Sequence, residues 1–202
     1  ALTVPAHDAA AFEAELGAVE SLHRIRLERA AEIHAQIGFN PAFWAGILPL
    51  SGRRSPFTLE LMAACVQFSA FVVQQVKLRF DLPRPAALSP RIHPMITTPA
   101  FSTYPSGHAT QASLISTMLW RVAGPGLADE WTQPVGDMLV ALAERIAQNR
   151  EVAGVHFPLD SAAGLELGAS LWALLVPTDA PADPQADAFQ WLLHQARSEW
   201  VP

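Results

Sequence analysis

Three short stretches of this sequence combine cations, histidines and small residues in the way that an oxyanion site requires. They are Lys77-x6-Arg84-Pro85, Pro105-Ser106-Gly107-His108 and Arg150-x5-His156-x3-Asp160. A helix that begins at the second stretch would present free N–H groups and a partial positive charge, and Gly107 would let the backbone approach an oxygen closely. Arginine forks onto two oxygens, and lysine adds a compact charge. The three stretches therefore predict a pocket for a tetrahedral anion such as phosphate or vanadate.

The two histidines have the chemistry for a reaction on that anion. One would lie in line with the central atom as nucleophile or metal ligand, and the other would exchange a proton on the opposite side. Asp160 follows His156 by four residues, so it would accept a hydrogen bond from the second ring nitrogen and fix the tautomer. His108, one turn inside the anion-binding helix, is then the expected proton carrier.

Each stretch also has a structural explanation that involves no ligand. Lys77 and Arg84 would be favoured at a helix C-terminus by the macrodipole, and serine is a frequent N-cap. His156 and Asp160 would form an i,i+4 pair, which stabilises a helix by about 0.2–0.5 kcal/mol. A single oxyanion site accounts for all three stretches at once, and we prefer it for that reason.

In order and in every internal spacing, the three stretches resemble the three-part signature of the PAP2-type acid phosphatase and vanadium-dependent haloperoxidase superfamily. The resemblance covers about residues 56–175. It implies that His156 is the phosphatase nucleophile or the axial vanadium ligand, and that His108 is the acid/base. The residues that would hold the oxyanion are Lys77, Arg84, Ser106, Gly107 and Arg150. The family usually has serine before the third-motif arginine, whereas this chain has Asn149, which puts one hydrogen bond at the edge of the site in doubt.

Residues near the motifs favour a haloperoxidase over a phosphatase by a narrow margin. Phe101, seven residues before His108, falls where vanadium chloroperoxidases carry a phenylalanine beside the halide, although an aromatic that anchors the loop is an equal explanation. Gln74 departs from the tryptophan that those enzymes have three residues before the lysine, and the chain is short for a haloperoxidase. The expected activity is oxidation of halide by hydrogen peroxide at vanadate bound to His156, with Lys77 as a catalytic cation.

Two other functions stay open. The alternative is a PAP2-type acid phosphatase that hydrolyses a phosphate monoester in the same pocket, with His156 attacking phosphorus and His108 protonating the leaving alcohol. The third is a catalytically idle helical bundle that binds an anion or a partner helix. The complete set of motif residues argues against this last function, because only Asn149 departs from the pattern.

The elements that must position these residues are expected to be helices. Helical periodicity and end signals predict an all-α antiparallel bundle of about six helices in a single domain, 1–202. The expected helices are 8–37, 56–80, 106–122, 129–151, 158–175 and 185–199. Six prolines in residues 81–106 forbid a continuous helix, and they predict one long Pro-rich loop at the active site. We also expect a turn-rich link at 39–55 and a C-terminal helix that docks on the bundle or on a second subunit.

Composition narrows the classes of partner and location. A formal charge of −6 disfavours a general nucleic-acid binder, and a single cysteine, Cys65, excludes an internal disulfide. The apolar stretches 59–76 and 165–176 carry polar residues, so both are interpreted as buried helices and membrane contact is not expected. The expectation is a soluble protein, either cytoplasmic or periplasmic/secreted. It would act on a small molecule, and a homo-oligomer is compatible with its apolar last helix.

Overall fold

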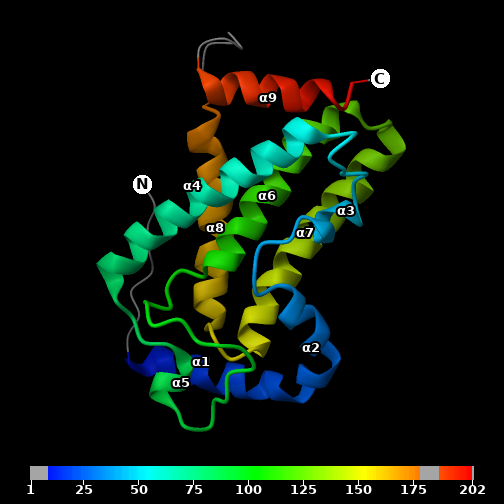
Figure 1. Cartoon of the computed structure of the whole chain (residues 1–202). Helices are drawn as coiled ribbons and strands as arrows, with labels where there is room; N and C mark the ends of the chain where they lie inside the picture. Colours follow the sequence, from blue (N-terminus) through cyan, green and yellow to red (C-terminus); the bar gives the residue numbers. More distant parts are fainter. Residues whose placement is uncertain (1–8, 178–186, 202) are drawn as a thin grey trace.

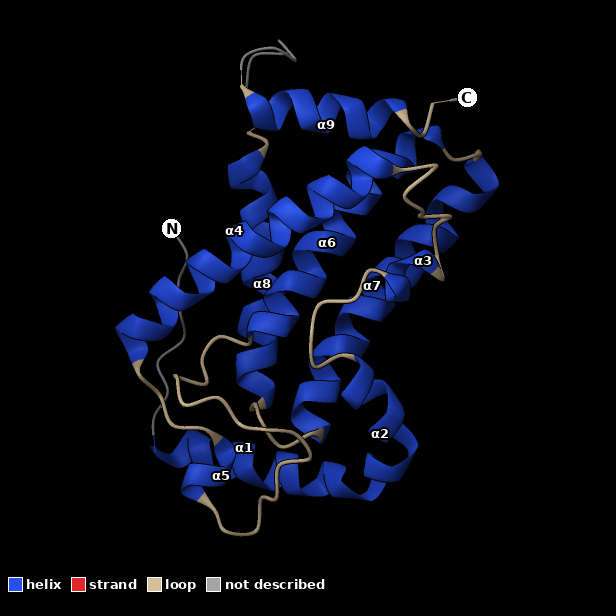
Figure 2. Cartoon of the chain, in the orientation of Figure 1, coloured by secondary structure: helices blue, strands red, loops and turns tan. Residues whose placement is uncertain are grey.

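The computed structural model describes residues 9–177 and 187–201, and these contain helices and loops but no strand (Figures 1 and 2). The predicted all-α fold is confirmed. The helices are α1 (Ala9–Ser21), η1 (Leu22–Ile25), α2 (Arg26–Ala35), α3 (Ala42–Ala45), α4 (Pro56–Phe80), α5 (Pro85–Leu88), α6 (Gly107–Ala123), η2 (Gly124–Gly126), α7 (Asp129–Val152), α8 (Pro158–Leu175) and α9 (Ala188–Ser198). The predicted ends at 8 and at 185–186 lie outside the described residues.

Helix α6 is the centre of the bundle and packs against α4, α7 and α8 (Figure 1). Its length agrees with the prediction, since it begins directly after the Pro-Ser pair and ends before Gly124-Pro125-Gly126. Apolar side chains from both sides of α6 are fully buried, which explains why it lies inside the bundle. These include Leu114, Ile115, Met118 and Leu119.

Two glycines on α8 let it lie unusually close to α6. A Cβ at Gly164 would lie 2.6 Å from the Ser106 carbonyl oxygen, and one at Gly168 would lie 2.4 Å from the Thr110 carbonyl oxygen. Both distances are shorter than any real contact, so the backbones can approach this closely only without side chains there. This contact fixes the start of α6 against the start of α8, and those two ends carry His108 and Asp160.

The N-terminal segment is not the single helix predicted over 8–37. It bends at the 3-10 turn η1, where Ile25 has φ −102° and ψ 6°. The physical reason is that two separate apolar clusters must be covered. Helix α1 places Val19 against Ile92 and Phe157, whereas α2 places Ile33 against the end of α7. One straight helix would not reach both clusters.

The last helix, α9, lies across one end of the bundle and packs on α4 (Figure 1). The Glu199 carboxylate accepts hydrogen bonds from the backbone N–H groups of Phe57 and Thr58, at 2.7 and 2.9 Å. These N–H groups belong to the first turn of α4 and have no partner within the helix. A side chain more than 140 residues away therefore caps α4.

The long loop between α4 and α6 contains only the one-turn helix α5. Its backbone is tied to itself, since Thr103 N–H donates to the Leu82 carbonyl and Leu82 N–H donates to the Ser102 hydroxyl, each at 2.9 Å. Met95 N–H donates to the Ala153 carbonyl just after α7. The predicted Pro-rich loop is thus held in a defined conformation beside the third motif.

Candidate active site

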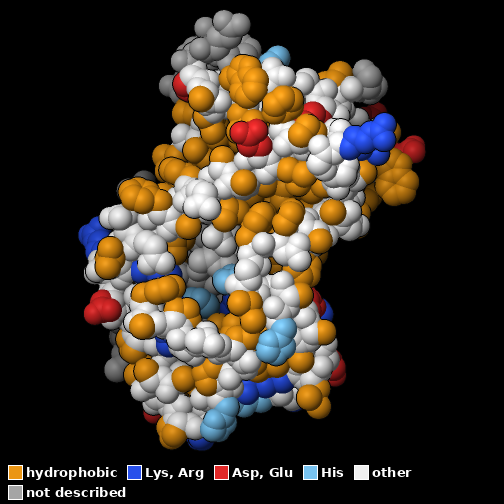
Figure 3. Space-filling view, viewed as in Figure 1, with side chains coloured by type: hydrophobic (Ala, Val, Ile, Leu, Met, Phe, Trp, Pro, Cys, Tyr) orange, Lys and Arg blue, Asp and Glu red, His pale blue; other side chains and the backbone are white. Residues whose placement is uncertain are grey.

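The three sequence motifs meet at one pocket of about 310 Å³. It opens on the face shown in Figure 3, where histidine and Lys/Arg side chains are visible inside a hollow. Seven of the nine residues singled out from the sequence line it: Lys77, Arg84, Phe101, Gly107, His108, Arg150 and His156. The other two, Ser106 and Asp160, are fully buried directly behind this lining.

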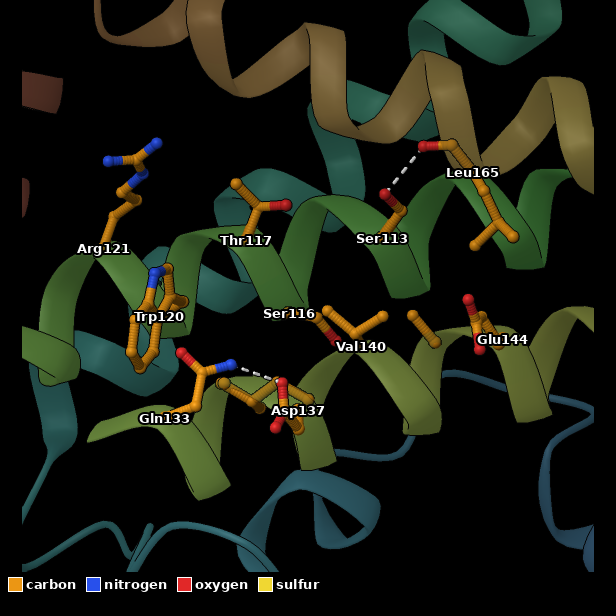
Figure 4. A pocket seen from close by; sticks show the side chains of 13 residues that line it. Ser113, Ser116, Thr117, Trp120, Arg121, Gln133, Asp137, Val140, Glu144 and Leu165 are labelled. Atoms are coloured by element: carbon orange, nitrogen blue, oxygen red, sulfur yellow. Dashed lines mark hydrogen bonds between the residues drawn. The ribbon is translucent and has the colours of Figure 1, made fainter. Parts of the chain in front are cut away.

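A larger cavity of about 420 Å³ lies between α6 and α7, away from the motifs (Figure 4). Its lining contains one cation, Arg121, together with Asp137 and Glu144, and no histidine. An oxyanion would meet two carboxylates and one cation there. The smaller pocket is therefore the candidate site, because its lining contains the cations and histidines that an oxyanion needs.

His156 is held in one orientation by Asp160. The ring lies just beyond α7, after a turn in which Gly154 has φ +75°, a value that favours glycine. Asp160 Oδ2 accepts from His156 Nδ1 at 3.1 Å, from the Phe157 N–H at 2.8 Å and from the Thr103 hydroxyl. A carboxylate only accepts, so Nδ1 carries the hydrogen and Nε2 keeps its lone pair.

Burial lowers the pKa of His156 to about 4, and the Asp160 hydrogen bond opposes this shift without cancelling it. The imidazole is therefore neutral near neutral pH. Its Nε2 lies 3.5 Å from Arg84 Nη1, on the pocket side. A neutral imidazole with an unprotonated Nε2 beside a guanidinium is the form that attacks an electrophilic centre.

The Pro-rich loop orients the two cations of the first motif. Lys77 Nζ donates to the carbonyls of Ser102 and Thr103 at 2.7 and 2.8 Å. Arg84 donates to the Phe101 carbonyl from Nε at 3.1 Å and to a carbonyl next to His156 from Nη1 at 2.8 Å. Backbone oxygens thus hold both charges in place before any anion arrives.

Ser106 has the role that the sequence allowed for it without a ligand, that of a helix cap. It is the N-cap of α6, and its hydroxyl accepts from the Ala109 N–H at 3.4 Å. Its own N–H donates to the Asp160 carbonyl at 2.9 Å, which joins the second motif to the third. A Cβ at Gly107 would touch only Val73, at an ordinary 3.7 Å, so protein packing does not require glycine there.

His108 and Arg150 contact a residue that the sequence gave no reason to choose. His108 Nε2 lies 2.9 Å from the backbone carbonyl of Gln36, and Arg150 Nη2 donates to Gln36 Oε1 at 3.1 Å. Arg150 is 1% exposed, yet its Nε has no partner among the residues that the structure describes. Arg150 also lines the pocket, and a guanidinium suits an anion there because its N–H groups are charged donors.

Asn149, where the family pattern has serine, does not line the pocket. It is fully buried against α2, where Nδ2 donates to Glu32 and Gln36 at 2.8 and 3.0 Å. Its Oδ1 accepts from Arg29 at 2.9 Å. The amide at position 149 is thus directed to the N-terminal segment and not to the edge of the pocket.

Comparisons with known proteins place these observations in a family. A model described as the PAP2 superfamily matches residues 59–181. Two strains of Mycobacterium tuberculosis have a decaprenylphosphoryl-5-phosphoribose phosphatase that is 31% identical over 130 residues. That match covers 64% of this chain and 65% of the relatives, so it spans less than two thirds of their length.

A similar fold occurs in a solved structure, described as the first transmembrane PAP2 type phosphatidylglycerolphosphate phosphatase from Bacillus subtilis. The TM-score is 0.62 at 20% identity, over 83% of this chain and 85% of that one. At this identity the match supports the fold. The fold and the family that the sequence predicted are both confirmed.

The expected haloperoxidase activity, with halide and hydrogen peroxide as substrates, is wrong, because the matched relatives are named as phosphatases. The motifs misled because the same cations and histidines suit either phosphate or vanadate. Phe101, assigned to a halide site, has another explanation in the structure. Lys77 Nζ and the Arg84 guanidinium lie 5.5 and 5.3 Å from the centre of its ring, within cation–π range.

The expected soluble location is also wrong. The solved structure with this fold is described as transmembrane, and the segment Pro56–Leu88 is long and apolar enough to cross a membrane. Polar residues such as Gln67 and Gln74 suggested a buried helix, but only 33% of the apolar window is buried. The family model spans well over half of the chain, and all three motifs meet in one pocket; this chain belongs to the PAP2 superfamily.

Proposed function

We propose that this protein is a phosphatase that hydrolyses a phosphate monoester through a phosphohistidine at His156. The observation that carries the proposal is the geometry of this one side chain. Nδ1 is held by Asp160, and Nε2 lies at the pocket beside Arg84. Phosphatase relatives in the same family add support, because they are named for the removal of phosphate from phosphorylated substrates.

In the first step, the phosphate lies against Lys77, Arg84, Arg150 and the first N–H groups of α6. His156 Nε2 attacks phosphorus, the bond to the ester oxygen breaks, and the leaving alkoxide takes a proton from His108. In the second step, water attacks the phosphorus of the phosphohistidine. His108 accepts a proton from that water, the P–N bond breaks, and inorganic phosphate leaves with His156 neutral again.

His108 must be protonated for the first step, and the ligand-free pocket opposes that state. Burial and, next, the nearby Arg150 lower the pKa of His108 to about 4. A bound phosphate brings negative charge close to His108 and to the same arginines, so it raises this pKa. We propose that the substrate supplies the charge that keeps the general acid protonated.

The substrate that we propose is a phosphate monoester carried on an apolar group at a membrane. Apolar side chains line part of the pocket, among them Ile37, Val73 and Ile96. Two large apolar side chains of α4 are exposed, with Phe71 at 64% and Leu78 at 77%. The relative's name also includes a polyprenyl group, decaprenylphosphoryl. Contact of α4 with lipid would bring such a substrate to the pocket mouth.

The test is release of inorganic phosphate from p-nitrophenyl phosphate and from a lipid phosphate in detergent micelles, by the purified protein. We expect His156→Ala to abolish hydrolysis of both, and His194→Ala, an exposed histidine on α9, to leave it unchanged. Acid quench with a ³²P-labelled ester should leave label on the wild type and none on His156→Ala. Hydrolysis by His156→Ala at the wild-type rate would refute the assignment.

Orthovanadate, expected from the sequence as a cofactor, is proposed here as an inhibitor that occupies the phosphate position. It adopts the trigonal-bipyramidal shape of phosphoryl transfer, so we expect it to compete with substrate at the wild-type pocket. Arg84→Ala should weaken this competition. An idle anion-binding bundle would bind orthovanadate yet release no phosphate.

A further inference from the structure

Gln36 is the C-cap residue of α2, outside all three motifs and outside the residues 59–181 that the family model matches. It is polar but only 3% exposed. Its N–H donates to the Glu32 and Ile33 carbonyls, which completes the last turn of α2. The rest of the residue faces the active site, and each of its polar groups has a partner there or on α2.

The backbone carbonyl of Gln36 holds His108. His108 Nε2 lies 2.9 Å from this oxygen and 3.3 Å from the Ile37 carbonyl oxygen. Both carbonyls lie at the end of α2, where they have no partner within the helix and carry the negative end of its dipole. A carbonyl only accepts, so Nε2 carries a hydrogen and Nδ1 is the nitrogen left to exchange a proton.

The side chain of Gln36 holds Arg150. Its Oε1 accepts from Arg150 Nη2 at 3.1 Å and from Asn149 Nδ2 at 3.0 Å, while its Nε2 donates to Glu32 Oε1 at 3.2 Å. Both ends of the carboxamide are therefore satisfied, and its orientation is fixed. Arg150, which lines the pocket, is fixed with it.

Asn149 belongs to the same arrangement. Its Nδ2 reaches both Glu32 and Gln36 on α2. A serine hydroxyl, which the family pattern has here, is shorter and has a single hydrogen to donate. The departure from the pattern and the position of α2 thus explain each other: an amide at 149 joins the third motif to the helix that carries Gln36.

We propose that Gln36 is a positioning residue that holds His108 and Arg150 in place for phosphoryl transfer, an inference that rests on the proposed phosphatase function. It does for His108 what Asp160 does for His156. Each histidine has one ring nitrogen fixed by an acceptor, Nδ1 in His156 and Nε2 in His108. The N-terminal segment is therefore part of the active site through a residue that does not itself line the pocket.

The first experiment compares two variants. One is Gln36→Leu, and the other is an exchange pair, a double variant that carries both Gln36→Glu and Glu32→Gln. Leucine keeps the volume but removes the acceptor for Arg150, so we expect kcat to fall by about 10–100-fold, the usual effect of losing an orienting partner. The exchange pair restores an acceptor at 36 and a donor at 32 without changing the net charge. We expect it to recover most of kcat. Gln67→Leu, an exposed position on α4, is the matched control.

The second experiment tests the carbonyl with Ile37→Pro. Proline disfavours the present conformation of the residue before it and so displaces the Gln36 carbonyl. Arg150 and Arg84 are the charged groups that face His108, and both lower its pKa, whereas the Gln36 and Ile37 carbonyls raise it. Displacing these carbonyls should therefore move the alkaline limb of the kcat–pH profile to lower pH. A merely structural role for Gln36 would leave this limb in place.

Orthovanadate affinity, measured by calorimetry, separates failure of the inference from failure of the proposed function. Wild type and Gln67→Leu that bind orthovanadate but release no phosphate would refute the phosphatase. Weaker binding by Gln36→Leu would still support Arg150 positioning. The inference would be overturned if the wild type is active and Gln36→Leu has the same kcat, KM, pH profile and orthovanadate affinity as the wild type. If Gln36→Leu does not fold, Gln36→Asn, which shortens the side chain by one methylene, replaces it in both measurements.

Discussion

At the scale of single residues, the site depends on hydrogen bonds that set which nitrogen of each histidine carries a proton. Asp160 Oδ2 accepts from His156 Nδ1, the Phe157 N–H and the Thr103 hydroxyl. A carboxylate suits all three donors at once. Thr103, which the sequence did not single out, is the residue that joins the Pro-rich loop to this carboxylate.

Asp160→Asn tests this arrangement. An amide has one acceptor oxygen and adds two N–H donors among groups that themselves donate, so the His156 ring loses its fixed tautomer. We expect kcat to fall by at least about 100-fold, with a smaller change in KM. Steady-state kinetics with p-nitrophenyl phosphate measure both constants. Asp137→Asn, exposed on α7, is the control, and equal kcat in both variants would contradict the role of Asp160.

The pH dependence of kcat/KM follows from the same two histidines. Burial lowers the pKa of His156 and of His108 to about 4 each. In the proposed mechanism, activity requires neutral His156, so it is lost as pH falls through the lower apparent pKa of the pair. It also requires protonated His108, so it is lost as pH rises through the upper one. We expect an acidic optimum for kcat/KM, with the alkaline limb of kcat at higher pH because bound phosphate raises the pKa of His108. An optimum above pH 8 for both constants would contradict this assignment.

At the scale of elements, the contact between α6 and α8 sets the distance between the two histidine-bearing motifs. Helix α8 crosses α6 at Gly164 and Gly168, where any Cβ would overlap the backbone of α6. The hydrogen bond from Ser106 N–H to the Asp160 carbonyl depends on that close approach.

Gly168→Ala should separate these helices. The new Cβ would lie 2.4 Å from the Thr110 carbonyl oxygen and 2.7 Å from Ser113 Cβ, and neither neighbour can move without moving α6. We expect a loss of about 1–3 kcal/mol in the free energy of unfolding, the usual cost of overpacking, together with lower kcat. Urea unfolding measures the first quantity. Gly17→Ala is the control, because a Cβ there meets nothing within 4 Å, and a loss equal to that of Gly168→Ala would argue against a steric cause.

At the scale of the whole molecule, segments outside the PAP2-matched residues complete the bundle at both ends. The N-terminal helices cover the clusters beside the third motif and bring Gln36 against His108. At the opposite end, α9 caps α4 through Glu199, and Trp200 Nε1 donates to Thr58 Oγ1 at 3.0 Å. The family core is thus stabilised by residues distant in the sequence.

Glu199→Gln tests the cap at the start of α4. The amide keeps one acceptor but loses the negative charge that favours a helix N-terminus. We expect the free energy of unfolding to fall by about 1 kcal/mol, as measured for lost N-caps. Glu166→Gln, exposed on α8, should change stability by no more than about 0.5 kcal/mol. Thermal unfolding of the two variants side by side checks the difference, and equal melting temperatures would contradict the cap.

Much of the fold and most of the site could be predicted from the sequence, for a local reason. Apolar spacing, prolines and glycines act on neighbouring residues, so the limits of α4, α6, α7 and α8 follow closely from them. The residues of each motif are close in the sequence, which keeps them close in space, although the first and third motifs each run from one helix into the next. The type of chemistry followed from these residue types, but the choice between phosphate and vanadate did not, because both anions need the same donors.

Other features depend on contacts between segments distant in the sequence, and only the tertiary structure decided them. The bend at Leu22–Ile25 exists because two apolar clusters must be covered. Gln36 has no motif around it, and its importance arises from where α2 ends in space. The sequence by itself determined the candidate reacting groups, which are His156, His108 and the cations that line the same pocket. The tertiary structure decided which partners orient them, because a hydrogen bond is selected by proximity in the fold and not by spacing along the chain.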